Sequence, residues 1–211
     1  MTIDTATGET PIVYPIQFEV RRDSSQSRIT NFPLGIGLFI RGILLIPHLI
    51  ILYFLQLAAG IVYLIATVAI LFTGRYPRGL FNFYVGYTRW TSNVYGYFFS
   101  AYDKYPPFSM DTQDFPLSFS AEYPETLSRL LNFPILGLFI KFILLIPHLI
   151  IVAFLAIVAM VVLFIAQFAI LFTGSFPEGM HKFMIGVGRW STRVNAYAYA
   201  LTDKYPPFSL S

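Results

Sequence analysis

Residues 34–72 read LGIGLFIRGILLIPHLIILYFLQLAAGIVYLIATVAILF, with Arg41 as their only charged residue. Residues 135–172 read ILGLFIKFILLIPHLIIVAFLAIVAMVVLFIAQFAILF, and they also hold a single charge, Lys141. Apolar runs of about 18 residues or more are typical of membrane-crossing helices. Charged residues make up 12% of the chain, which is about half of their share in soluble domains. The sequence therefore predicts an integral membrane protein.

The rest of the composition excludes other classes of protein. The net charge of +3 in 211 residues fits the cytoplasmic excess of Lys and Arg in membrane proteins better than it fits a nucleic-acid partner. The absence of cysteine excludes disulfides, thiolate metal sites and cysteine nucleophiles. The first 30 residues are polar, with Asp4 and Glu9 and no apolar segment, so we do not expect a cleaved signal peptide.

The two apolar runs belong to an internal duplication. Residues 37–109 recur at an offset of 100 as residues 137–209, and about 40 of the 73 positions are identical. Upstream the offset is 101, because the second copy has lost one residue beside Gly37. We therefore divide the chain into a tail (1–13), a first repeat (14–109), a linker (110–114) and a second repeat (115–211).

Each repeat has three predicted parts. A short stretch with apolar residues at alternate positions (14–20 and 115–119) predicts a β-strand. The long apolar run follows and ends at a Thr-Gly pair. The third part, residues 80–102 in the first copy, is rich in aromatic residues and precedes a Tyr-Pro-Pro-Phe motif, whose paired prolines stop a helix.

For each long run we expect a hairpin of two transmembrane helices. A straight helix of 39 residues is about 58 Å long, whereas the hydrocarbon core of a bilayer is about 30 Å thick. No Lys or Arg lies between the halves of either run. If each run is a hairpin, all Lys and Arg residues outside the two runs lie on one side of the membrane. The excess of Lys and Arg on the cytoplasmic side of membrane proteins makes that side the cytoplasm. The rival topology, with one span per run, inverts the second copy and puts near-identical basic segments on opposite sides. The midpoints, residues 56–60 and 156–160, lack good turn residues.

The third part of each repeat predicts an amphipathic helix at the membrane surface. In the second copy, three basic residues are spaced seven and four apart and share one helical face. Lys, Arg and Trp are favoured at the headgroup layer. Two alternatives are open. The helix packs against its own bundle, or it spans the membrane with a buried arginine. The candidates for contact with anionic lipid are Arg89, Trp90, Lys182, Arg189, Trp190 and Arg193.

The predicted fold is an all-α membrane protein built from two pseudo-symmetric repeats. Each repeat is a transmembrane helical hairpin plus an amphipathic interfacial helix, with short strand segments before it.

Several short motifs recur in both copies, namely N-F-P, I-P-H-L-I, I-L-F-T-G, R-W and D-K-Y-P-P-F-S. In this combination the chain resembles an uncharacterised bacterial family of membrane proteins that is known only as a domain of unknown function. The resemblance covers both repeats and implies a bacterial, multi-pass membrane protein, often with the unit in tandem. It implies no catalytic residue and no substrate.

Each apolar run contains one cation and one histidine. Arg41 with His48, and Lys141 with His148, are separated by seven residues and therefore share a helical face. An ionisable side chain inside a membrane is a candidate functional group. In the structural interpretation, the cations extend to the headgroups and each neutral histidine bonds a carbonyl that the preceding proline has freed.

Two other interpretations of the histidines are open. Because the repeat relates them by pseudo-symmetry, they suit the two axial positions of a haem, or they act as relays in a proton or ion path. Neither run contains an acidic residue, and nothing else supports haem, so we expect no cofactor and no metal. Nucleophile, phosphate-loop and zinc-protease motifs are missing, so we do not expect an enzyme.

By function the sequence predicts a non-catalytic protein of the bacterial cytoplasmic membrane, with both termini in the cytoplasm. We expect it to be an accessory component of a membrane complex or an organiser of anionic lipid. The alternative is a small transporter or channel with its path between the repeats. The expected partners are the lipid bilayer, with its anionic lipids, and other membrane subunits, but no nucleic acid.

Overall fold

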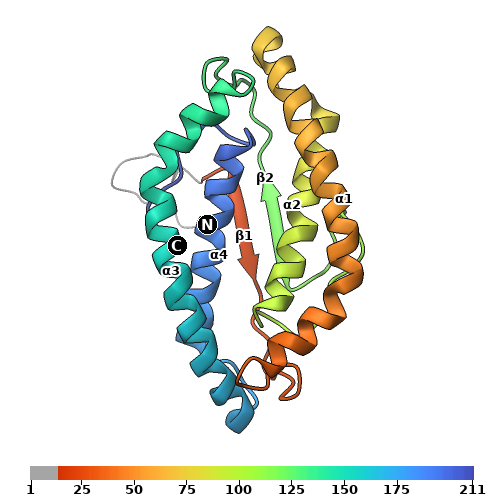
Figure 1. The fold of residues 1–211 in the computed structure, drawn as a ribbon, viewed down its shortest axis with the longest axis vertical. Helices are drawn as coiled ribbons and strands as arrows, with labels where there is room; N and C mark the ends of the chain where they lie inside the picture. Colours follow the sequence, from red (N-terminus) through yellow and green to blue (C-terminus); the bar gives the residue numbers. More distant parts are fainter. Residues whose placement is uncertain (1–13) are drawn as a thin grey trace, which may run out of the picture.

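The computed structural model describes residues 14–211, and this part of the chain contains four α-helices and two β-strands. In chain order they are β1 (Ile16–Val20), α1 (Ile36–Thr73), α2 (Arg78–Phe98), β2 (Leu117–Ala121), α3 (Leu136–Thr173) and α4 (Glu178–Ala198). The long helices α1 and α3 form the two outer sides of an elongated molecule, and α2, α4 and the strands lie between them (Figure 1). The tail predicted for residues 1–13 lies outside the described residues.

Each apolar run forms one continuous helix of 38 residues, so the predicted transmembrane hairpins are wrong. The midpoints, residues 56–60 and 156–160, are helical throughout. A turn there would leave backbone N–H and C=O groups unpaired among apolar side chains. Neither midpoint contains the Asn, Asp or Pro that favours a turn, and continuing the helix pairs all of these groups.

The two repeats run in opposite directions along the molecule. In Figure 1 the chain rises through α1 and descends through α3, so a pseudo-two-fold axis lies along the line of sight. The structure thus shares one feature with the rival topology, a single helix for each run, and these two helices run antiparallel.

Each long helix ends at a glycine that the other repeat caps. Gly74 and Gly174 take the left-handed conformation, with φ of 71° and 76°, which glycine adopts without strain. The carbonyl of Gly174 accepts a hydrogen bond from the Gln26 N–H (2.8 Å), and that of Gly74 accepts one from Leu127 N–H (2.8 Å). The loop before each long helix thus satisfies the C-terminus of the other long helix.

The predicted amphipathic helices exist as α2 and α4, but they lie inside the molecule. Pro77 and Pro177 precede their first turns, where a missing N–H does no harm. α2 packs along α1 on one side and against β2 on another, and α4 packs along α3 and against β1. Each shorter helix therefore joins a long helix to the sheet.

The two predicted strands are confirmed, and they are exchanged between the repeats. β1 and β2 pair antiparallel, with Phe18 opposite Phe119. β1 of the first repeat packs on α4 of the second, whereas β2 packs on α2. Arg189 Nε donates to the carbonyl of Phe18 (2.9 Å), and Arg89 Nε donates to that of Phe119 (3.1 Å). Each repeat therefore binds a strand that the other repeat supplies.

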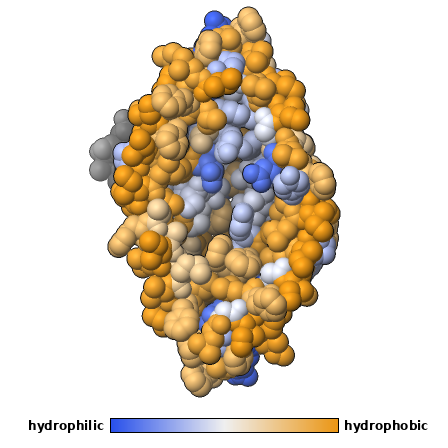
Figure 2. All heavy atoms as spheres, viewed as in Figure 1, coloured by the Kyte–Doolittle hydropathy of each residue, from blue (hydrophilic) through white to orange (hydrophobic). Residues whose placement is uncertain are grey.

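Most of the surface of the long helices is apolar and exposed. The segments Ile46–Thr73 and Leu136–Thr173 are long and apolar enough to cross a membrane. Apolar side chains cover both outer sides of the molecule, whereas polar residues gather at its centre (Figure 2). An exposed apolar surface of this extent is typical of a contact with a membrane or with another protein.

A strained residue follows α2 and offers a test of the fold. Ser100 is left-handed (φ 61°), and its hydroxyl is buried without a hydrogen-bond partner among residues 14–211. Because this conformation costs a non-glycine residue about 1–2 kcal/mol, we expect Ser100→Gly to raise the free energy of unfolding by about 1 kcal/mol. Ser92→Gly, inside α2, is the control and should lower it by about 0.5–1 kcal/mol. Thermal unfolding in mild detergent measures both, and a destabilised Ser100→Gly variant would contradict the assignment.

Candidate functional site

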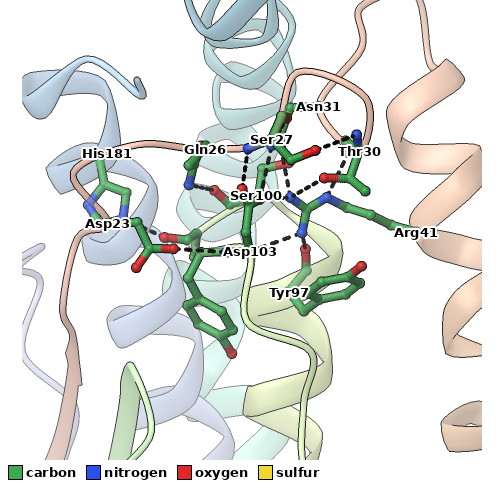
Figure 3. A network of polar contacts seen from close by, with 12 residues as sticks. Asp23, Gln26, Ser27, Thr30, Asn31, Arg41, Tyr97, Ser100, Asp103 and His181 are labelled. Atoms are coloured by element: carbon green, nitrogen blue, oxygen red, sulfur yellow. Dashed lines mark hydrogen bonds and ion pairs between the residues drawn. The ribbon is translucent and has the colours of Figure 1, made fainter. Parts of the chain in front are cut away.

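Arg41 of α1 is fully buried and bonds the end of α2 (Figure 3). Its Nη1 donates to the carbonyls of Tyr97 (2.6 Å) and Tyr102 (3.1 Å). Its Nη2 donates to Asn31 Oδ1 (3.0 Å) and forms an ion pair with Asp103. We call these five residues the Arg41 cluster. The prediction that Arg41 extends to the headgroups is wrong, because its guanidinium is held inside the repeat.

The end of a helix is a favourable place for a buried cation. The last carbonyls of α2 have no donors within the helix, and they carry the negative end of its dipole. Asp103 adds a full negative charge, and the Ser27 N–H and Asn31 Nδ2 hold its carboxylate in place. The Arg41 cluster thereby joins three segments of the first repeat, namely the loop before α1, α1 itself and the segment after α2.

The second repeat builds the same cluster around a lysine. Lys141 is fully buried, and its Nζ donates to Asn132 Oδ1 (2.7 Å) and to the carbonyl of Tyr197 (2.9 Å). The carboxylate of Asp203 lies 3.5 Å from Nζ. The prediction of an extended side chain is therefore wrong for Lys141 as well.

His48 forms a second anchor on the same face of α1. Trp90 Nε1 donates to His48 Nδ1 (2.9 Å), and the ring of Phe108 stacks on the imidazole at 3.8 Å between ring centres. The sequence analysis expected His48 to bond a carbonyl near Pro47. In the structure the Tyr105 hydroxyl donates to such a carbonyl, Leu44 O, at 2.8 Å. We call His48, Trp90, Tyr105 and Phe108 the His48 stack. The second repeat has the equivalent contacts around His148.

The geometry of the histidines does not fit haem ligation. An indole N–H can only donate, so Nδ1 of His48 and of His148 must be acceptors and the proton lies on Nε2. A metal ligand needs a free lone pair on the nitrogen that faces the metal. Each imidazole is also fully buried within its own repeat, with a phenylalanine ring on its face.

The three arginines predicted to bind lipid are engaged by the chain itself. Arg89 Nη1 donates to the carbonyl of Met110 (2.6 Å), and Arg189 Nη1 donates to that of Leu210 (2.8 Å). Arg193 is only 9% exposed. These side chains fasten the segment that follows each shorter helix, and the structure brings none of them to an open basic surface.

The remaining candidates for lipid contact divide between the interior and the surface. Trp90 and Trp190 are buried, at 6% and 5% exposure, so the prediction that their rings contact lipid is wrong. The side chain of Lys182 is 75% exposed and lies 2.7 Å from Glu178. Contact with anionic lipid stays a prediction for Lys182.

A cavity of about 680 Å³ lies between the two repeats. The sheet closes one side of it with Phe18, Val20 and Leu117, while α2 and α4 form its walls. Figure 2 shows it as a polar hollow between apolar sides. Its polar lining residues are Gln56, Tyr84, Tyr87, Thr88, Thr91, Ser92, Tyr95, Ser191, Thr192, Asn195 and Tyr199.

The lining of the cavity combines apolar with polar side chains and is uncharged. No Asp, Glu, Lys, Arg or His of residues 14–211 contributes to it. Burial raises the pKa of Tyr84 and Tyr87 above the ordinary value for a phenol, so both hydroxyls stay neutral at physiological pH. The rings of Tyr84 and Tyr199, from different repeats, lie 5.3 Å apart. The cavity therefore offers hydroxyl, amide and aromatic groups to a ligand.

The two copies of the repeat differ most clearly at the cavity. Tyr87 is equivalent to Val187 and Gly60 to Met160, and only one alanine is shared among the equivalent lining positions. In contrast, all four residues of the His48 stack recur unchanged in the second copy. Stabilising contacts are thus alike in both copies, whereas each copy supplies its own side chains to the cavity.

Sequence reasoning missed both the cavity and the acidic partners of the buried cations. Asp103 lies 62 residues from Arg41, outside the apolar run in which a partner was sought. A signal for this pairing was available in the sequence. Each copy has a single cation in its apolar run, and each also has an aspartate in a recurring D-K-Y-P-P-F-S motif. The cavity carried no motif, since it forms between repeats rather than within one.

Two stretches of the chain, residues 36–110 and 136–209, match one protein family, described as a domain of unknown function (DUF4389). Both matches fall on the duplicated segments, which confirms the tandem duplication of an uncharacterised unit. No curated protein and no solved structure matches the chain.

The Arg41 cluster makes a prediction about stability. Asp103→Asn leaves the buried guanidinium without its countercharge, and we expect the free energy of unfolding to fall by about 2–3 kcal/mol, somewhat less than for a fully buried pair. Asp114→Asn removes the exposed pair with Arg21 and should cost less than about 1 kcal/mol. Chemical unfolding of the two variants in detergent compares them. Equal, small effects would show that the cluster does not hold the repeat together.

Proposed function

We propose that this chain, which belongs to the DUF4389 family through both of its repeats, is a non-catalytic membrane protein that binds an uncharged amphiphilic molecule between those repeats. The observation that carries the proposal is the cavity between α2 and α4. Its lining differs between the copies at nearly every equivalent position, although the contacts that hold each repeat together are the same. A site that is asymmetric in chemistry suits a ligand with two unlike ends.

The lack of charge in the described lining indicates which class of ligand the cavity can bind. An ion that enters the cavity loses its hydration, and the described lining offers no opposite charge to replace it. Hydroxyl and amide groups such as Thr91, Ser191 and Asn195 can instead bond neutral oxygen atoms of a ligand. The absence of carboxylate, ammonium, guanidinium and imidazole groups from the described lining also argues against a proton path and against acid–base catalysis in this cavity.

The size and the aromatic lining of the cavity also suit a small molecule. Binding pockets for such ligands measure about 300–1,000 Å³, and this cavity falls within that range. Tyr84, Tyr87 and Tyr199 present ring surfaces that pack against a planar ring or an acyl chain. A ligand with a neutral polar group and an apolar body satisfies both kinds of lining.

The membrane setting of the proposal is supported by α1 and α3. Their exposed apolar surfaces would be costly in water, and a bilayer also supplies amphiphilic ligands. We propose the bacterial cytoplasmic membrane as the location and an accessory role beside other membrane subunits. The exposed Lys182 suits contact with an anionic headgroup.

A transport path between the repeats has weaker support. The cavity does lie between the two repeats, as such a path requires. The sheet, however, closes one side through Phe18 and Leu117, and the exchanged strands tie the repeats together at that side. We therefore expect no solute flux above the leak in a liposome assay.

Filling the cavity tests the proposed binding. Gly60 lines the cavity, a Cβ atom there meets nothing within 4 Å, and the second copy carries Met160 at the equivalent position. We expect Gly60→Trp to fold normally and to lose at least about tenfold in bound amphiphile, equivalent to about 1.4 kcal/mol. Native mass spectrometry of protein purified in mild detergent measures the occupancy.

The matched control is Gly79→Trp. Gly79 lies in the first turn of α2, outside the lining of the cavity, and a Cβ atom there also meets nothing within 4 Å. This variant should retain the bound mass of the wild type. If the wild type carries no amphiphile, or if both variants lose it equally, the proposed binding site is wrong.

A further inference from the structure

The apolar face of α1 is too long for a helix that crosses a bilayer upright. α1 contains 38 residues and is therefore about 57 Å long, whereas the hydrocarbon core is about 30 Å thick. To fit, the helix would have to tilt by about 60°, beyond the range of about 0–40° for spanning helices. Residues near both ends of the helix, Phe39 and Phe72, are 70% and 75% exposed, so the apolar face does not shorten at either end.

This apolar face also carries no charged residue. Phe39, Ile50, Ile61 and Phe72 are all exposed, and their spacing of 11 residues is close to three helical turns. They therefore share one side of α1. Arg41 and His48 of α1, which belong to the two anchors described above, are fully buried. No charged side chain on this side marks a boundary between lipid and water.

The sheet carries the polar side of the molecule. Glu19, Ser118 and Ser120 are exposed on its outer face, and the exposed Arg21–Asp114 pair lies at its end. The strands lie midway along the long axis (Figure 1). An upright molecule would hold these polar side chains, with strand backbone, in the middle of the hydrocarbon, where an exposed charge is costly and lipid-exposed strand edges do not occur.

We infer that the molecule lies flat in one leaflet, with α1 and α3 in the plane of the membrane and the outer face of the sheet in water. One leaflet contributes about 15 Å of hydrocarbon, which accommodates a helix about 10–12 Å across. The pseudo-two-fold axis then lies along the membrane normal. Equivalent basic segments of the two copies reach the same side, in keeping with the distribution expected for a membrane protein.

This orientation turns the mouth of the cavity toward the lipid. The sheet closes the watery side, whereas exposed residues at the middles of the long helices, including Gln56, Gly60 and Met160, line the opposite side. If the cavity binds an amphiphile, as proposed above, that molecule comes from the bilayer, with its neutral polar group in the cavity and its chains in the leaflet. The orientation itself does not depend on that binding.

Depth measurements with single cysteines test the orientation, because the chain has no cysteine of its own. Spin labels at Phe39→Cys, Ile50→Cys, Ile61→Cys and Phe72→Cys report four depths along one face of α1. The equivalent positions 139, 150, 161 and 172 in α3 are also exposed and repeat the measurement. The protein is studied in vesicles of phosphatidylethanolamine and phosphatidylglycerol, with oxygen and a water-soluble nickel complex as relaxation agents. Ser118→Cys reports the outer face of the sheet.

The flat orientation predicts that the four labels on α1 lie at one depth, to within about half a helix diameter. The Ser118→Cys label should be open to the nickel complex. A helix that crosses the bilayer gives the opposite pattern, with labels at 39 and 72 in water on either side and labels at 50 and 61 near the centre. That pattern, or a Ser118→Cys label shielded from the nickel complex, overturns the inference. Because no label lies inside the cavity, the outcome is independent of whether an amphiphile is bound.

Discussion

A buried cation at the end of each shorter helix is the contact on which the rest of the structure depends. Arg41 and Lys141 are fully buried, and each bonds a terminal carbonyl of α2 or α4 and an aspartate that follows it. Apolar packing gives little net attraction between helices in lipid, because the lipid is itself apolar. In the membrane setting that we propose, directed polar contacts therefore decide where a long apolar helix docks. The histidine stacks add a second fixed point two turns further along the same face.

The position of the cavity follows from these anchors and from the exchange of strands. The anchors hold α2 against α1 and α4 against α3, and the antiparallel pair of β1 and β2 brings the two repeats together. The space that remains between the repeats is the cavity. Duplication allows the anchors to stay alike while the lining changes, because no lining residue belongs to the Arg41 cluster or to the His48 stack. The family match supplies no activity, so the functional argument rests on this site and not on the fold.

The sequence predicted the features that depend on local patterns. Period-two stretches predicted both strands, and the offset of 100 residues predicted two alike repeats. The hairpins were wrong because the reasoning compared the helix length with the bilayer thickness, which assumes an upright helix. Neither the partners of Arg41 nor the cavity could be predicted from the sequence, and the reason is different. Asp103 lies 62 residues away, and the cavity needs both repeats in place, so neither leaves a mark in a single stretch of sequence.

We propose above that the space between α2 and α4 holds a neutral amphiphile. A crystal structure in a lipidic mesophase, from protein purified with its native lipids, tests this claim most directly. We expect electron density for a non-protein molecule beside Tyr87 and Asn195, with its apolar part leaving the cavity between the long helices. A cavity that holds only water, or one closed by the approach of α2 to α4, would contradict it.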